Sequence, residues 1–256
     1  MLTFLAAVAC AANATPAELD AAWRGFSDSQ QRHLRVALPA PTAADWLELA
    51  NGNTVTHRSR TDHEAGNRVL AMRFIDQPPV SVWLAILDGK HAGLSVEYSE
   101  WTISATPTSK VLYQHLDLPF PIANRHWILE AHSNGELYTK SGMTAWERSW
   151  ALDARGEAAL ASLPASVREA GASAIWTPKN RGGWLLLAVG WGTLAIYQLE
   201  TDIGGWIPDD LVASYALSTL KTLVDRTAAL ADRVAVHYTT GHNAIYAPDG
   251  TPVPPY

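Results

Sequence analysis

Cysteine is almost missing from this 256-residue chain, which has a single one, Cys10. A lone thiol excludes an internal disulfide and a cysteine-based zinc site. Basic residues are in the minority, because 19 Lys and Arg stand against 25 Asp and Glu and leave a net charge of −6. This balance, without a basic cluster in the sequence, argues against a nucleic-acid partner.

The apolar run at the start of the chain is short. Residues 2–12 are too few to span a bilayer, and they lead into residues 12–14, A-N-A, a pattern typical of signal-peptide cleavage. We therefore expect residues 1–14 to be a signal peptide and the protein to be secreted or periplasmic. Two alternatives stay open: a cytoplasmic protein with an ordinary N-terminal helix, or a protein lipid-anchored through Cys10.

The sequence also lacks the common catalytic motifs. It has no G-x-S-x-G elbow, H-E-x-x-H pair, Walker loop or dinucleotide fingerprint, and its nine His show no metal-ligand spacing. We therefore expect no catalytic residues, no cofactor and no metal. What the chain does have is Trp, eleven against four Phe. Trp joins a large apolar body to an N–H that needs a partner, so it suits either a cavity wall or a filled core.

The order of patterns along the chain predicts one main domain with extensions. Residues 15–39 form an N-terminal helical segment, residues 40–236 the domain, and the proline-rich residues 237–256 a loose tail. Within the domain, Asn51-Gly52 predicts a hairpin between strands at 46–50 and 54–59, and Asn134-Gly135 predicts another between strands at 126–132 and 137–152. A helical stretch is expected at 80–87, and a helical insertion or flexible flap at 153–172. Further strands are expected at 68–75, 96–105, 110–118, 126–132, 137–152, 174–178, 183–189 and 193–201.

The last element reads as one long helix. Pro208 suits the first helical position, Asp209 and Asp210 suit a helix N-terminus, and apolar residues then recur every three or four positions. The periodic stretch of about 28 residues would be about 42 Å long. Strands and hairpins followed by one amphipathic helix predict an α+β fold, in which an antiparallel sheet packs on the helix and can leave a ligand pocket between them.

Two spaced motifs resemble those of START domains, the lipid-transfer modules related to the steroidogenic acute regulatory protein. Residues 118–127, L-P-F-P-I-A-N-R-H-W, resemble the family's proline turn followed by Asn-Arg-Asp and an aromatic residue, with His126 in place of the Asp. Residues 202–208, D-I-G-G-W-I-P, resemble the loop that leads into the family's final helix. The resemblance covers about residues 40–235 and implies the helix-grip fold, a curved antiparallel sheet wrapped around a long C-terminal helix.

This resemblance implies that the protein binds, and possibly transfers, a lipid or other hydrophobic small molecule without catalysing a reaction. Transient contact with a membrane surface would follow, and the oligomeric state stays open. The alternative is an enzyme of the cyclase or hydratase type on the same fold. Such an enzyme would need a cavity-facing His or Arg beside a carboxylate. A cavity that contained His115, Arg148 and Glu147 together would favour it.

Strand periodicity and the resemblance together select the candidate ligand contacts. Tyr113 and His115 share one strand face, as do Trp146 and Arg148, and filling the core is the alternative role for each. Arg125 could contact the ligand or hold its own turn in place. The full set of candidate ligand-binding residues is Tyr113, His115, Arg125, Trp146, Arg148, Tyr197, Trp206, Tyr215, Ala216 and Thr219.

Overall fold

The computed structural model describes residues 14–30, 38–60, 67–88, 98–118, 120–205 and 209–256. Its helices are α1 (Pro16–Gln30), α2 (Ala43–Ala50), α3 (Pro79–Leu87), α4 (Gly135–Lys140), the 3₁₀ helix η2 (Gly156–Ser162), α5 (Ala165–Ala170), α6 (Asp209–Ala231) and α7 (Val234–His237). Its strands are β1 (Val55–Arg60), β2 (Asn67–Ile75), β3 (Tyr98–Ala105), β4 (Ser109–Leu116), β5 (Arg125–Ser133), β6 (Ala145–Leu152), β7 (Ile175–Trp176), β8 (Lys179–Val189) and β9 (Gly192–Asp202).

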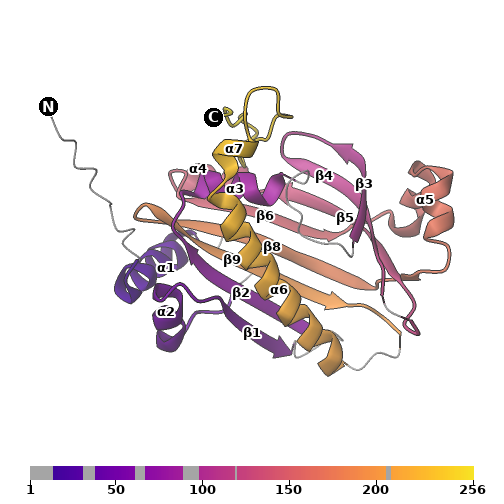
Figure 1. Cartoon of the computed structure of the whole chain (residues 1–256), viewed down its shortest axis with the longest axis horizontal. Coiled ribbons are helices and arrows are strands. Elements are labelled where there is room, and N and C mark those ends of the chain that lie inside the picture. The colour runs from indigo at the N-terminus through magenta and orange to yellow at the C-terminus, as the bar shows by residue number, and fades with distance from the viewer. Residues whose placement is uncertain (1–13, 31–37, 61–66, 89–97, 119, 206–208) are drawn as a thin grey trace, which may run out of the picture.

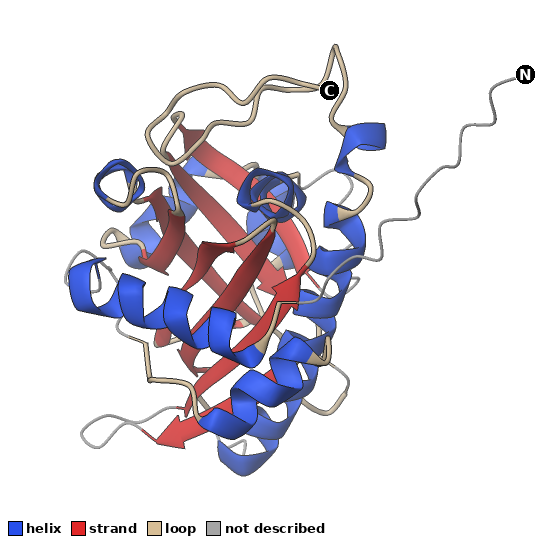
Figure 2. Ribbon diagram, turned by 90° about the vertical axis from the view of Figure 1, so that its left-hand side faces the viewer, coloured by secondary structure: helices blue, strands red, loops and turns tan. Residues whose placement is uncertain are grey.

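Nine strands in the described part of the chain form one sheet, in the order β1-β2-β9-β8-β6-β5-β4-β3 with β7 beside β5 (Figure 1). All neighbours are antiparallel except the short β5–β7 pair. β6 pairs with only the second half of β5, and β7 pairs with the start of that strand. Helices lie on both sides of the sheet (Figure 2). We call these sides the α6 face and the α1 face.

The α6 face carries the largest apolar cluster. α6 lies over β1, β2 and β9 and also contacts α3, which packs on β8 and β9. Ala216, Leu220, Val224 and Ala231 of α6 are buried in this cluster, at four- and seven-residue spacing along one stripe of the helix. In Figure 1 the long helix α6 crosses the sheet on the viewer's side, as expected for the helix-grip fold.

The α1 face is covered by two separate helical layers. α1 and α2 bury Leu19, Trp23 and Leu49 against β2, β6, β8 and β9. On the other half of the sheet, η2 and α5 bury Val111, Ile128 and their neighbours. The 153–172 segment is therefore a helical insertion, one of its two predicted forms.

Two predicted hairpins are wrong, because local capping favours helices. Residues 43–50 form α2, whose Thr42 and Asp45 make a capping box, and the chain turns at Asn51-Gly52 from a helix into β1. Asn134 likewise caps α4 by accepting the backbone N–H of Leu137 at 3.0 Å. The strand expected at 137–152 consequently begins only at Ala145.

The prediction of a loose C-terminal tail is also wrong. Ile245 and Val253 are buried, and the hydroxyl of Tyr238 donates to Val253 O at 2.8 Å and accepts from Ile245 N at 3.0 Å. The tail also reaches α3, where Trp83 Nε1 donates to Tyr246 O at 2.9 Å. Trp83 and Tyr246 lie far apart in sequence, so the prolines of the segment gave no sign of this contact.

Candidate ligand-binding site

Arg148 is the one charged residue among the predicted contacts that faces α6 from the middle of the sheet. Trp146, Arg148 and Trp150 alternate with Ala145, Glu147 and Ser149 along β6, and the register opposes Arg148 to Trp184 on one side and Ser133 on the other. Trp146 and Trp150 both belong to the cluster under α6. By the two-residue period of a strand, Arg148 points to the same side.

The Arg148 guanidinium has one polar partner in the described structure. Its Nη1 donates to Ser133 Oγ at 3.2 Å, and no described carboxylate lies within ion-pair distance. Burial lowers the pKa of Arg148 to about 10, while the charge of Glu100 acts in the opposite direction. The side chain therefore stays cationic at neutral pH, although it lies mainly among aromatic and aliphatic groups.

An aromatic wall stands beside this arginine on the same face. The ring of Tyr197 lies 5.3 Å from that of Trp150 and 4.8 Å from that of Trp184. Trp150 satisfies its own N–H by donating to Asn180 Oδ1 at 3.1 Å. Three large rings from β6, β8 and β9 thus form an apolar surface on which the N–H of Trp150 is already paired.

A chain of hydrogen bonds continues the face toward the edge strand β3. Glu100 accepts from Lys110 Nζ at 2.7 Å and from Gln114 Nε2 at 2.9 Å, and Gln114 Oε1 accepts from Trp127 Nε1 at 2.8 Å. The leucines that pack beside Trp127 on this face are Leu112, Leu116, Leu118, Leu129 and Leu152. Sequence reasoning missed Glu100, Lys110 and Gln114. Lys110 and Gln114 lie on the opposite face of their strand from Tyr113, so the two-residue strand period was the signal that could have found them. Glu100 is opposite Gln114 on β3.

Tyr113 and His115 lie on the other side of the sheet, which corrects their prediction as ligand contacts between the sheet and α6. Tyr113 is buried with Val167 under the helical insertion, and its hydroxyl lies 3.2 Å from His126 Nδ1. His115 Nδ1 lies 3.4 Å from Asp117 Oδ1. The pair does share a strand face, as predicted, but that face packs on η2 and α5.

Arg125 holds two loops together. It is only 2% exposed, and its guanidinium donates to Ile203 O at 2.6 Å, to Gly204 O at 3.0 Å and to Ala123 O. Burial lowers the pKa of Arg125. The structural role considered for this residue therefore describes it best, with backbone carbonyls in place of the expected carboxylate partner. The two family-like motifs meet at this contact.

The other predicted contacts divide between core and face. Trp146 is core, because its ring lies 5.6 Å from that of Trp83 and 4.9 Å from that of Tyr138, while Tyr197 belongs to the aromatic wall. Ala216 is buried in the cluster under α6, and Thr219 is half-buried on the same helix. Trp206 and the side chain of Tyr215 lie outside the described residues.

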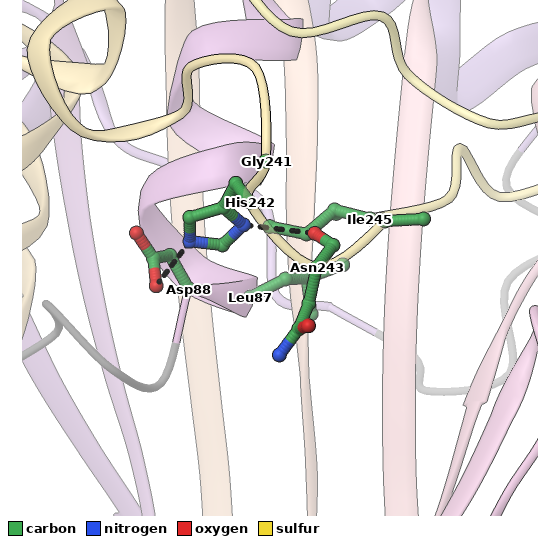
Figure 3. Close-up of a pocket in the computed structure, with 7 residues that line it drawn as sticks. Leu87, Asp88, Gly241, His242, Asn243 and Ile245 are labelled. Carbon is green, nitrogen blue, oxygen red and sulfur yellow. Dashed lines mark hydrogen bonds and ion pairs between the residues drawn. The ribbon is translucent and has the colours of Figure 1, made fainter.

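Two pockets formed by described residues lie away from Arg148. One, of about 250 Å³, is lined by Leu87, Asp88 and residues 241–245 (Figure 3). There His242 joins the tail to the end of α3, with its Nε2 3.3 Å from Asp88 Oδ1 and its Nδ1 2.8 Å from Asn243 O. The other, of about 260 Å³, lies between α1, β8 and the turn that joins α4 to β6, and is lined in part by Phe26 and Leu187. Both are smaller than the roughly 300 Å³ at which ligand pockets usually begin.

Solved structures share this architecture at low sequence identity. A STAR-related lipid transfer protein from Xanthomonas axonopodis matches 70% of this chain and 93% of its own, with a TM-score of 0.55 and 15% identity. Human StAR-related lipid transfer protein 5 matches 85% and 97%, with a TM-score of 0.55 and 12% identity. Human STARD10 matches 82% and 78%, with a TM-score of 0.53 and 11% identity. The fold is that of START domains.

The START resemblance seen in the two motifs is thus confirmed at the level of the fold. No family model matches the sequence, and no curated protein matches it significantly. No helix in the described part of the chain is both long and apolar enough to cross a membrane. Among the described residues, His, Cys, Asp and Glu side chains form no group of three that could hold a metal ion.

Proposed function

We propose that this START-fold protein binds a lipid or other hydrophobic small molecule between α6 and the sheet, and catalyses no reaction on it. The observation that carries this proposal is a half-buried arginine, Arg148, which has no carboxylate partner in the described structure and is set in a face of aromatic and aliphatic side chains. Pockets for apolar ligands have this composition, in which a few polar groups fix orientation. The lipid transfer proteins that share the fold support the same class of ligand.

The apolar part of the ligand would supply most of the binding energy. At about 25 cal/mol per Å², burying about 400 Å² of hydrocarbon gives a gross gain of about 10 kcal/mol. Losses of translational and rotational freedom consume about 4 kcal/mol or more of this gain. A net micromolar affinity is therefore reachable with one polar contact, and α6 or a neighbouring loop would move for the ligand to enter.

The residues named for an enzyme do not assemble. Arg148 faces α6, whereas Glu147 and His115 belong to the α1 face, Glu147 opposite Leu185 and His115 opposite His126. An acid–base pair needs both groups within reach of one substrate. The arrangement therefore favours a binding protein over a cyclase or hydratase.

Native mass spectrometry tests this function. The protein is purified under mild conditions, sprayed without denaturation, and its bound small molecules are extracted and identified. We expect a co-purified lipid, or binding of at least one member of a panel of fatty acids, phospholipids and sterols. Absence of both would refute the function. A secreted or periplasmic location, with exchange at a membrane surface, remains part of the proposal, and the mass of the mature protein would reveal whether residues 1–14 are removed.

A further inference from the structure

We infer that the ligand carries an anionic oxyacid group, a carboxylate or phosphate, and that Arg148 binds it. This inference rests on the proposed function and adds the chemical class of the head group. Three observations carry it. Arg148 has no counter-charge in the described structure, Glu100 is already paired with Lys110, and the Nε and Nη2 edge of the Arg148 guanidinium has no described partner.

A counter-charge for Arg148 is missing from the described structure. Buried charges in proteins are normally paired, because an uncompensated ion in an apolar setting is costly. The one described partner of Arg148 is the Ser133 hydroxyl, which is neutral and lies 3.2 Å from Nη1. A site built in this way leaves the compensating negative charge to the ligand.

Glu100 does not fill that role. Its two carboxylate oxygens accept from Lys110 Nζ at 2.7 Å and Gln114 Nε2 at 2.9 Å, so its charge is already matched by an ammonium on the neighbouring strand. Glu100, Lys110 and Arg148 together therefore carry one net positive charge. A neutral alcohol would leave that charge unmatched, and a cationic head group would add to it.

The unoccupied side of the guanidinium also fits an oxyacid. Nη1 is used by Ser133, whereas Nε and Nη2 have no partner in the described structure, and neither is among the fully buried polar atoms without a hydrogen bond. These two N–H groups point in parallel from one edge of the planar group. That edge matches two oxygens of a carboxylate or phosphate in a bidentate contact, which a hydroxyl cannot make.

The test compares ligands that share one chain and differ only in the head group. Palmitate, hexadecyl phosphate, hexadecanol and hexadecylamine compete with the neutral fluorescent probe N-phenyl-1-naphthylamine for the purified full-length protein. For the wild type we expect both anions to bind about 10- to 100-fold more tightly than the alcohol, the range of one charged bidentate contact, and the amine to bind most weakly. The order of the two anions distinguishes a carboxylate site from a phosphate site.

Two variants separate binding from a structural role. In Arg148→Gln we expect the anions to fall to the affinity of the alcohol, while the affinity for the alcohol is unaffected. The ligand-free variant should unfold at the same or a higher temperature, because a charge without a counter-charge in an apolar setting is gone. Arg24→Gln, which makes the same charge change on the exposed surface of α1, should alter nothing.

Equal binding of palmitate and hexadecanol by the wild type would overturn the inference and leave the proposed function standing. Failure of every ligand, together with no displacement of the probe, would refute the function itself. Equal loss of all ligands in Arg148→Gln, with a lower unfolding temperature, would make Arg148 a structural residue and also overturn the inference.

Discussion

Arg125→Gln should destabilise the fold strongly without altering the face that we propose binds the ligand. The guanidinium of Arg125 donates to the carbonyls of Ile203 and Gly204 and thereby joins the β4–β5 turn to the loop before α6. Hydrogen bonds to charged groups contribute about 1.5–3 kcal/mol each, and a buried acceptor left without a donor adds a penalty. After some relaxation around the shorter side chain, we expect the free energy of unfolding to fall by about 3–5 kcal/mol.

Urea unfolding followed by Trp fluorescence measures this loss, and thermal unfolding should show a decrease of about 6–20 °C for a domain of this size. Gly205→Ala perturbs the same contact from the other side. A Cβ there would lie 3.0 Å from Arg125 Nη2, and the residue has φ of +82°, so we expect a loss of about 1–2 kcal/mol. Arg125→Lys should recover only part of the stability, because an ammonium cannot reach both carbonyls in a fork. A loss below about 1 kcal/mol in Arg125→Gln would refute the clamp.

Three further perturbations have defined outcomes. Burial, together with the charge of His115, lowers the pKa of His126, so the neutral form of His126 stabilises the fold above about pH 6.5 and that contribution is lost as pH falls through the lower folded pKa. His126→Gln should therefore flatten the pH dependence of the urea midpoint between pH 7.5 and 5. An unchanged slope would contradict this. Burial raises the pKa of Glu200, but hydrogen bonds and charges from Arg181 and Lys179 outweigh this effect and hold the pKa at about 2. Glu200→Gln should therefore lower the free energy of unfolding by about 3 kcal/mol at pH 7 and by nearly nothing at pH 2. Equal losses at both pH values would show that the ion pairs are not the source of the stability. Tyr238→Phe removes both hydrogen bonds that the Tyr238 hydroxyl makes to the tail. This change should lower the free energy of unfolding by about 1–2 kcal/mol and speed amide hydrogen exchange after residue 238. Unchanged exchange would mean that other contacts hold the tail.

Local patterns predicted the elements whose signals were strong and uncontested. The apolar spacing of residues 211–230 predicted α6, and the two motifs around Arg125 and Gly204 predicted the helix-grip fold. For that arginine the sequence left a structural role and a ligand contact both open. Prediction failed where a stronger local signal competed, as at Thr42 and Asp45, whose capping box makes the segment before Asn51-Gly52 a helix. It also failed for the tail, where Tyr246 accepts a hydrogen bond from Trp83, far away in the chain, and Tyr238 binds residues 245 and 253 within the tail.

The sequence by itself determined which residues share a strand face, because side chains alternate with a period of two whatever surrounds them. It grouped Tyr113 with His115 and Arg148 with Trp146, and both groupings hold in the structure. Only the tertiary structure decided which group faces α6, since each choice depends on where helices distant in sequence come to pack. That decision moved Tyr113 and His115 beneath the insertion of η2 and α5. It left Arg148, with a neutral hydroxyl as its described partner, on the face that we propose binds the ligand.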